Sequence, residues 1–328
     1  MRRAWARPET IIVQDPVWTA TARRADIVLP ATSSIERNDI SGNKRSDHVI
    51  AMQKAIEPLG LARNDFDIFR HIADEMGVEA AFSEGREEMD WIRMMYERTR
   101  EDASHRFKHP MPAFDAFWAE GAASVPTRAN YTFLDRFRAD PQAHPLKTES
   151  GRIVLWSHEL DGLQLDDCLP HPAWIEPAEW LGSASARPEQ LHLISRQPQG
   201  KLHSQLDDAP AAQASKRDGR EQVRIHPIDA KRLHIADGDA VRLFNERGQC
   251  LATAMVADSV RPGVVVLPTG SWYDPEDDGD NPLDRSGNPN VLTLDKGSSK
   301  FGQGCSAHTC LVSIEVYRHT HSTQEVTS

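Results

Sequence analysis

Residues 191–205, LHLISRQPQGKLHSQ, pass from a short apolar strand into a polar loop. Pro198 and Gly200 interrupt the stretch, as is typical of loops. A strand that leads into a polar, partly cationic loop is where many α/β and β proteins bind phosphate-bearing ligands, although an ordinary surface loop has the same composition. The candidate binding residues of this stretch are Arg196, Lys201, His203, Ser204 and Gln205.

The sequence that follows this loop predicts an all-β domain. Apolar residues alternate over short segments such as 241–243 and 251–255, and tight turns separate these segments. His226-Pro227 predicts the start of one short helix, and Cys310 to Val316 predicts a closing strand. Short strands with a single helix favour a barrel. We therefore expect residues 187–328 to form a closed β-barrel.

The first 80 residues predict part of an α/β domain. Residues 11–13 and 26–29 have the β-branched composition of buried parallel strands, and Asn64 or Asp65 is positioned to cap a helix over 66–76. Asp15 lies just past the first strand, where doubly wound sheets bind ligands and a carboxylate can accept ribose hydroxyls. So few elements cannot cover both faces of a parallel sheet. We expect a partial doubly wound α/β domain.

Residues 81–186 predict a connecting segment with no catalytic chemistry. An amphipathic helix is expected over 87–100, a short helix near 114–118, and a turn and a strand within 151–156. Residues 168–188 are rich in proline and tryptophan, which is typical of an extended segment pinned by aromatic side chains. Core packing is the expected role of these residues.

Composition excludes several classes of function. The 328-residue chain has a formal net charge of −11, which argues against a nucleic-acid partner. It has no apolar run of the ~20 residues that a membrane span needs, and no secretory signal peptide is predicted. Its four cysteines lack the spacing of a zinc or iron–sulfur site. The sequence leaves a cytoplasmic and a bacterial periplasmic location open.

Six stretches together resemble one family. The chain is similar to the C-terminal portion of the molybdopterin-dependent oxidoreductases of the dimethyl sulfoxide reductase family, in the branch of the biotin sulfoxide and trimethylamine-N-oxide reductases. The similarity covers nearly the whole chain and is weakest over 78–150. The matching stretches are WTATARRADIVLPATSSIERNDI (18–40), ARNDFDIF (62–69), SRQPQGKLHSQLD (195–207), IADGDAVRLFNERG (235–248), RPGVVVLPTGSWYDP (261–275) and GNPNVLTLDKGSSKFGQG (287–304).

The resemblance implies a fold and a cofactor. Residues 1–80 would be the C-terminal half of a cofactor-binding α/β domain, 81–186 a connecting segment, and 187–328 a six-stranded, double-psi-like barrel that binds the molybdopterin dinucleotide. The full-length enzyme would carry molybdenum in bis(molybdopterin guanine dinucleotide), with no iron–sulfur cluster in this chain. Asp15 and Asp65 would contact ribose or guanine. Pterin and phosphate groups would be held by Arg196, His203, Ser204, Gln205, Asn290, Gln303 and Gly304.

The chemistry of these residues agrees with that assignment. A carboxylate such as Asp65 can accept the guanine N–H donors, and the amides of Gln205 and Gln303 match the mixed donors and acceptors of a pterin. Arg196 and Lys201 would offset pyrophosphate charge. Each has an ordinary alternative: an acid in the first turn of a helix stabilises the helix dipole, and a loop histidine such as His203 often bonds to backbone.

The sequence also departs from the family. The part of the family that supplies the molybdenum ligand has no counterpart here, and Cys305 and Ser306 do not match its position. No catalytic residue or metal ligand is therefore assigned. We expect a fragment, a truncated gene product or one piece of a split enzyme, inactive alone, that self-associates or binds an N-terminal half. A non-catalytic module that binds a nucleotide or a partner is the alternative.

Overall fold

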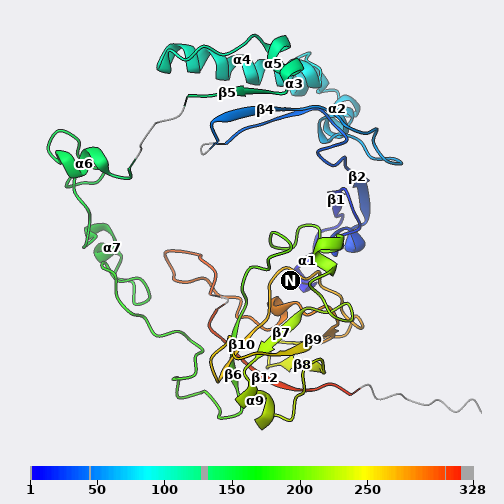
Figure 1. Ribbon diagram of the computed structural model, residues 1–328, viewed down its shortest axis with the longest axis vertical. Coiled ribbons are helices and arrows are strands. Elements are labelled where there is room, and N and C mark those ends of the chain that lie inside the picture. Colours follow the sequence, from blue (N-terminus) through cyan, green and yellow to red (C-terminus); the bar gives the residue numbers. More distant parts are fainter. Residues whose placement is uncertain (1, 44–45, 127–131, 307, 319–328) are drawn as a thin grey trace, which may run out of the picture. The chain divides into compact units, whose positions relative to one another are not determined.

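The computed structural model describes residues 2–43, 46–126, 132–306 and 308–318 (Figure 1). The chain forms two compact units, residues 1–144 and 145–328. The three-part division at 80 and 186 stays a prediction. No helix in the described part of the chain is both long enough and apolar enough to span a bilayer.

The first unit contains the expected parallel pair of strands. β1 (Ile12–Asp15) and β2 (Ile27–Pro30) pair in parallel, with Ile12 opposite Ile27. A 3₁₀ turn, η1, connects them within a short linker, so no full helix fits between the strands. Ile12 and Ile27 are 57% and 45% exposed, which leaves this small sheet with apolar surface in solvent. The helices before and between these strands are α1 (Arg2–Trp5) and η1 (Ala22–Arg24).

A second, antiparallel sheet in this unit carries its own core. The Tyr96 and Phe117 rings stack at 4.1 Å between centroids, and the Tyr96 hydroxyl donates to the Pro112 carbonyl at 2.8 Å. Asn64 begins α2 by accepting the Phe66 N–H at 3.1 Å, as one of the two predicted caps would. The elements are β3 (Asp39–Ser41), β4 (His48–Met52), β5 (Ala122–Ser124), α2 (Asp65–Glu75), α3 (Glu79–Ser83), α4 (Glu88–Phe107), α5 (Phe114–Glu120) and α6 (Asp135–Ala139).

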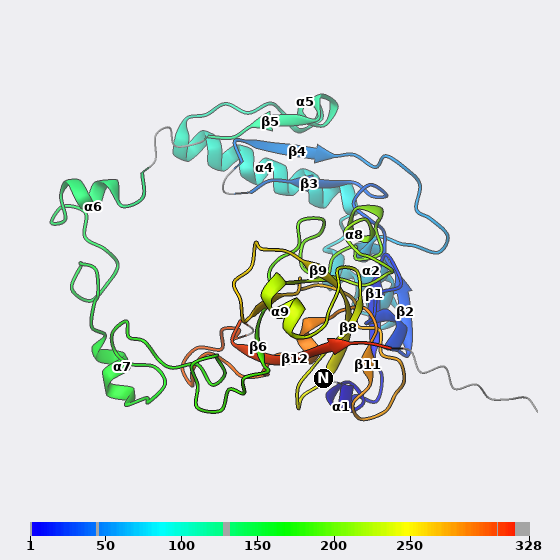
Figure 2. The ribbon, with the colours of Figure 1, turned by 60° about the horizontal axis from the view of Figure 1, so that its bottom comes forward.

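The second unit is built around a closed barrel of six strands (Figures 1 and 2). The hydrogen-bonded order is β9-β7-β10-β6-β12-β8, and β8 pairs with β9 to close the ring. β11 pairs in parallel with the first two residues of β9. The pairings are both parallel and antiparallel. The strands are β6 (Leu191–Ile194), β7 (Gln222–Ile225), β8 (Ala240–Phe244), β9 (Gln249–Val256), β10 (Val264–Val266), β11 (Leu283–Asp284) and β12 (Cys310–Val316).

Alternation along these strands directs apolar side chains into the barrel. Leu191, Leu193 and Leu243 are fully buried in one cluster to which every barrel strand contributes. Closure removes strand edges from the ring. The predicted fold class, a partial α/β domain followed by a closed six-stranded barrel, is confirmed. The helices of this unit are α7 (His158–Leu163), α8 (Pro210–Gln213), α9 (Pro227–Arg232) and η2 (Pro289–Val291).

The prediction of a strand within 151–156 is wrong. These residues form bends and irregular chain, and Leu155 is 74% exposed. Residues 168–188, beyond α7, are irregular, as expected. Glu179 fixes it to the barrel by a bidentate pair with Arg247 (2.5 and 2.9 Å) and by accepting the Leu311 N–H at 2.9 Å. An ion pair thus connects this segment to the barrel, and the ring of His171 in the segment also stacks on Trp156 at 5.2 Å between ring centroids.

Candidate functional site

The polar loop leaves the middle of the barrel wall. β6 lies between β10 and β12, so the chain emerges from the core at Ser195, which is itself buried. The Arg196 carbonyl accepts the Thr269 N–H at 2.9 Å, which extends the contact with the chain that follows β10. The loop then turns over residues 203–208 before α8. Its first residues are thus positioned by the barrel itself.

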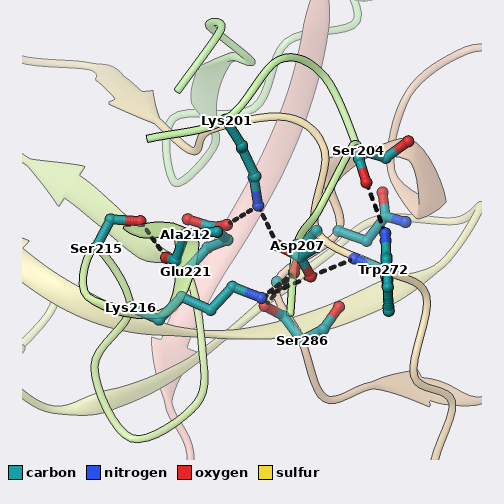
Figure 3. Close-up of polar contacts among 12 residues, drawn as sticks. Lys201, Ser204, Asp207, Ala212, Ser215, Lys216, Glu221, Trp272 and Ser286 are labelled. Atoms are coloured by element: carbon teal, nitrogen blue, oxygen red, sulfur yellow. Dashed lines mark hydrogen bonds and ion pairs between the residues drawn. The ribbon is translucent and has the colours of Figure 1, made fainter. Parts of the chain in front are cut away.

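A buried network of four charged side chains anchors the loop (Figure 3). The Lys201 ammonium donates to Asp207 Oδ1 and, at 2.7 Å, to Glu221 Oε1, and the Lys216 ammonium donates to Asp207 Oδ2 at 2.7 Å. All four side chains are at most 5% exposed. Two ammonium groups face two carboxylates, so the formal charges cancel. Such compensation is what allows charges to be buried. We call these four residues the ion-pair network.

The ion-pair network favours the ionised form of the Asp207 carboxyl, although this residue is buried. Burial is the largest single influence and raises the pKa of this carboxyl, but hydrogen bonds from Lys201, Lys216 and the Trp272 N–H together outweigh it. The pKa of Asp207 is therefore lowered. The Trp272 N–H lies 3.0 Å from Asp207 Oδ2. Asp207 is thus the centre of the network, because its two oxygens accept from three donors.

A second set of contacts holds the exposed tip of the loop. The Trp272 indole N–H donates to the Ser204 carbonyl at 2.7 Å. Gly270 lies against the loop backbone: a Cβ there would be 1.7 Å from the His203 carbonyl oxygen. Only glycine permits such an approach. His203 itself has φ of +52°, an uncommon conformation for a residue with a side chain. His203, Ser204 and Gln205 remain exposed on this tip.

Arg196 has an unsatisfied donor next to the loop. Its Nε is buried and, among the described residues, has no hydrogen-bond partner. A buried donor without a partner is costly, more so on a charged group. An anionic oxygen supplied by a ligand would satisfy it. Lys201, in contrast, already has two carboxylate partners within the protein. The two cations that were predicted to face pyrophosphate therefore have different surroundings.

A second loop carries the remaining barrel candidates. Gly297 and Cys305 form a bridge, and the Ser298 N–H donates to the Gly304 carbonyl at 2.9 Å. Gln303 is exposed, and its amide donates to the Ser299 carbonyl at 2.9 Å. Asn290 lies apart from this bridge, exposed in η2. This loop is thus a narrow hairpin that turns over residues 299–302, with Gln303 and Gly304 on its returning arm.

An acidic turn holds this hairpin in place. The Lys300 ammonium donates to Asp166 at 2.8 Å, and the Lys300 N–H donates to Asp167 at 2.9 Å. The ion pair raises the pKa of Lys300 through the Asp166 hydrogen bond and lowers that of Asp166. Both groups are exposed, so salt screens the attraction. The hairpin is therefore held less firmly than the 195–207 loop.

Asp15 and Asp65 belong to the other unit. Asp15 ends β1, and its carboxylate accepts the Thr19 hydroxyl at 2.6 Å. Asp65 is the first residue of α2, directly after the cap Asn64, and is half-buried. Both lie at ends of elements, as predicted. Their contact with a ligand stays a prediction, as does that of the barrel residues.

Most residues of the ion-pair network were not predicted from the sequence. Lys216 and Glu221 were not singled out, and Asp207, Gly270 and Trp272 were noted only within longer matching stretches. The signal that could have found them is the equal number of opposite charges near Lys201. In the described residues, no group of three or more His, Cys, Asp or Glu side chains is arranged to hold a metal ion.

Comparison with known proteins agrees with these features. Residues 191–311 match the family model described as Molydopterin dinucleotide binding domain, and residues 1–75 match the model described as Molybdopterin oxidoreductase. The biotin sulfoxide reductase of Cereibacter sphaeroides is 61% identical over 317 residues, which cover 97% of this chain and 42% of that protein. The dimethyl sulfoxide/trimethylamine N-oxide reductase of the same organism is 46% identical over 97% of this chain and 39% of that protein.

A solved structure shares the fold. Acetylene hydratase from Pelobacter acetylenicus superposes with a TM-score of 0.71 at 18% identity, over 96% of this chain and 41% of that chain. The chain thus spans about two-fifths of the length of the curated relatives that it matches. The matched models cover the parallel strands of the first unit and the ring from β6 to the first two residues of β12. The chain belongs to the molybdopterin oxidoreductases of the dimethyl sulfoxide reductase family and carries their molybdopterin-dinucleotide-binding domain.

Proposed function

We propose that this chain is the cofactor-binding part of a molybdenum enzyme that reduces an S-oxide or an N-oxide. The bound cofactor would be bis(molybdopterin guanine dinucleotide), which supplies the metal centre for oxygen-atom transfer. The observation that carries the proposal is the buried Arg196 Nε, which has no partner among the described residues and lies at the start of a loop that the protein already holds in shape. The names of the relatives supply the class of substrate.

Each candidate residue has a chemical task in this proposal. Arg196 binds an anionic oxygen of the pyrophosphate, and Gln205 and Gln303 offer amide donors and acceptors to the pterin edge. His203 and Ser204 contribute through the exposed tip, while Gly304 and Asn290 contribute from the other loop. Lys201 differs from the prediction: we assign it to the support of the loop, because its ammonium is already bound by Asp207 and Glu221. Asp15 and Asp65 would accept from ribose or guanine.

The experiment measures what the purified chain carries. The chain is expressed in a bacterial host that makes the cofactor, and the pterin, guanine nucleotide and molybdenum are measured per mole of protein. We expect Arg196→Met to lower the pterin content about tenfold or more, since a charge-assisted hydrogen bond contributes about 1.5–3 kcal/mol. Arg261→Met, at an exposed turn before β10, is the matched control and should retain it. Equal pterin content in both variants would contradict the assignment of Arg196.

The same measurement separates the enzyme part from a plain binding module. Pterin and molybdenum in the wild-type chain, alone or with an added N-terminal partner, support the enzyme reading. A guanine nucleotide without pterin or metal supports a nucleotide-binding module, and none of the three supports a partner-binding module. For turnover we propose that further protein is needed, so this chain alone should not reduce a sulfoxide or an amine N-oxide with a viologen donor. Turnover above background would overturn that part.

A further inference from the structure

We propose that the ion-pair network is a positioning device that holds residues 202–206 in the ligand-binding shape before the cofactor arrives. The inference rests on the proposed function, since it assigns the ligand of this loop. The inference assigns a role in binding to residues that do not themselves contact the ligand. Lys201, Asp207, Lys216 and Glu221 would act through the exposed residues between them, and would be positioning residues.

Both ends of the exposed tip enter the network. Lys201 precedes the tip and is tied to Glu221, whose backbone is fixed by the Thr253 N–H at 3.0 Å and by the Ser286 carbonyl at 3.1 Å. Asp207 follows the tip and binds the Trp272 N–H. Figure 3 shows both anchors meeting at Asp207. Between two buried ends, a tip of five residues has little freedom.

The tip is held in a conformation that it would not adopt alone. His203 and Leu206 have φ of +52° and +51°, in the left-handed region that residues with side chains avoid. The close approach of Gly270 to the His203 carbonyl constrains the tip further. Strained backbone persists only where its surroundings determine it, and such positions concentrate at ligand sites. The network supplies that determination here.

Charge balance makes the proposal testable apart from stability. Removing Lys201 alone leaves two carboxylates facing one ammonium in a buried site, which destabilises a protein strongly. Removing Lys201 and Glu221 together restores neutrality and leaves the Lys216–Asp207 pair intact. The double variant therefore regains stability but still lacks the tether between the loop and the start of β7. A purely structural network predicts that function returns with stability.

The experiment compares Lys201→Met with Lys201→Met/Glu221→Gln in the full chain. We expect the single variant to melt several degrees lower and the double variant to melt close to wild type. Amide hydrogen exchange of residues 202–207 should be at least tenfold faster in the double variant, with β6 and β12 unchanged. The pterin content of the double variant should fall about tenfold. This is the loss expected if only about one molecule in ten holds residues 202–206 in the ligand-binding conformation, because apparent affinity falls with that fraction.

The control removes an ion pair on the barrel strands. Arg242 Nη2 on β8 lies 2.6 Å from Glu315 Oε1 on β12. The variant Arg242→Met/Glu315→Gln should change neither hydrogen exchange in residues 202–206 nor pterin content. Wild-type exchange and wild-type pterin in the Lys201→Met/Glu221→Gln variant would overturn the inference. If the wild-type chain holds no pterin, the proposed cofactor site fails. Hydrogen exchange still decides whether the network holds the tip.

Discussion

Replacing Gly270 by alanine tests the close approach between the barrel and the loop tip. The glycine has φ of +94°, and a Cβ would lie 1.7 Å from the His203 carbonyl oxygen and 2.4 Å from its carbon. Ordinary contacts of a Cβ begin near 3.4 Å. The His203 carbonyl must therefore retreat by more than an ångström, which would loosen the Ser204–Trp272 hydrogen bond.

Two contributions add in this variant. The left-handed backbone costs alanine about 1–2 kcal/mol, and overpacking against backbone adds about 1–3 kcal/mol. Gly219→Ala is the matched control, because that glycine has φ of +75° in the same unit with no atom within 4 Å of the added Cβ. We expect Gly219→Ala to lower the free energy of unfolding by about 1–2 kcal/mol, and Gly270→Ala by about 2–5 kcal/mol.

Native-state hydrogen exchange of the β6 and β12 amides measures the free energy of unfolding of the barrel by itself, without assuming that both units unfold together. If residues 202–206 rearrange and the barrel is not destabilised, the Gln205 amide, which donates to the Leu202 carbonyl at 3.0 Å, should exchange faster. Equal effects of the two glycine substitutions on both readouts would refute the close approach and the packing argument built on it.

Three further predictions follow from other contacts. The pKa of Asp207 is lowered below its ordinary 3.8, so its contribution to stability is complete above pH 3.8 and is lost as the pH falls through the lower pKa of the folded state. The melting temperature should therefore be level from about pH 7 to 5 and fall below about pH 4. A decline that begins at pH 6 would contradict this prediction. Arg247→Met should cost about 1–3 kcal/mol and speed proteolysis of 168–188, with no further loss when Glu179→Gln is added; additive losses in urea denaturation would speak against the pair. If the chain associates through the exposed strands of its first unit, Ile12→Lys should shift it to monomer in sedimentation, whereas Leu61→Lys, at an 84% exposed site, should not; a wild-type monomer at high concentration would rule out that interface.

The sequence predicted the barrel well because alternation and turns are local. Cys310 to Val316 was expected as the closing strand, and β12 has those bounds. The stretch 151–156 also contains β-branched residues, but within the described part of the chain no strand pairs with it, so intrinsic preference did not decide its structure. The end of β1 at Asp15 and the cap of α2 at Asn64 were likewise readable from local patterns.

The surroundings of the candidate residues could not be predicted in the same way. Lys201 and Arg196 have the same charge and lie five positions apart, yet one has two buried carboxylate partners and the other has an unsatisfied Nε. The difference comes from Glu221, which is close to Lys201 only because of how β7 enters the barrel. Long-range convergence of this kind is set by strand order, which hydrophobic alternation does not specify.

The strand order also dictates when this domain can fold during synthesis. Of the six barrel strands, β12 is the last to leave the ribosome, and it pairs with both β6 and β8. Until Val316 has emerged, those two strands each have an open edge, although the rest of the ring is already available. Open edges invite pairing with other chains. The unfinished barrel is therefore open to mispairing until β12 has been made, and a ligand that needs the closed ring can bind only after that.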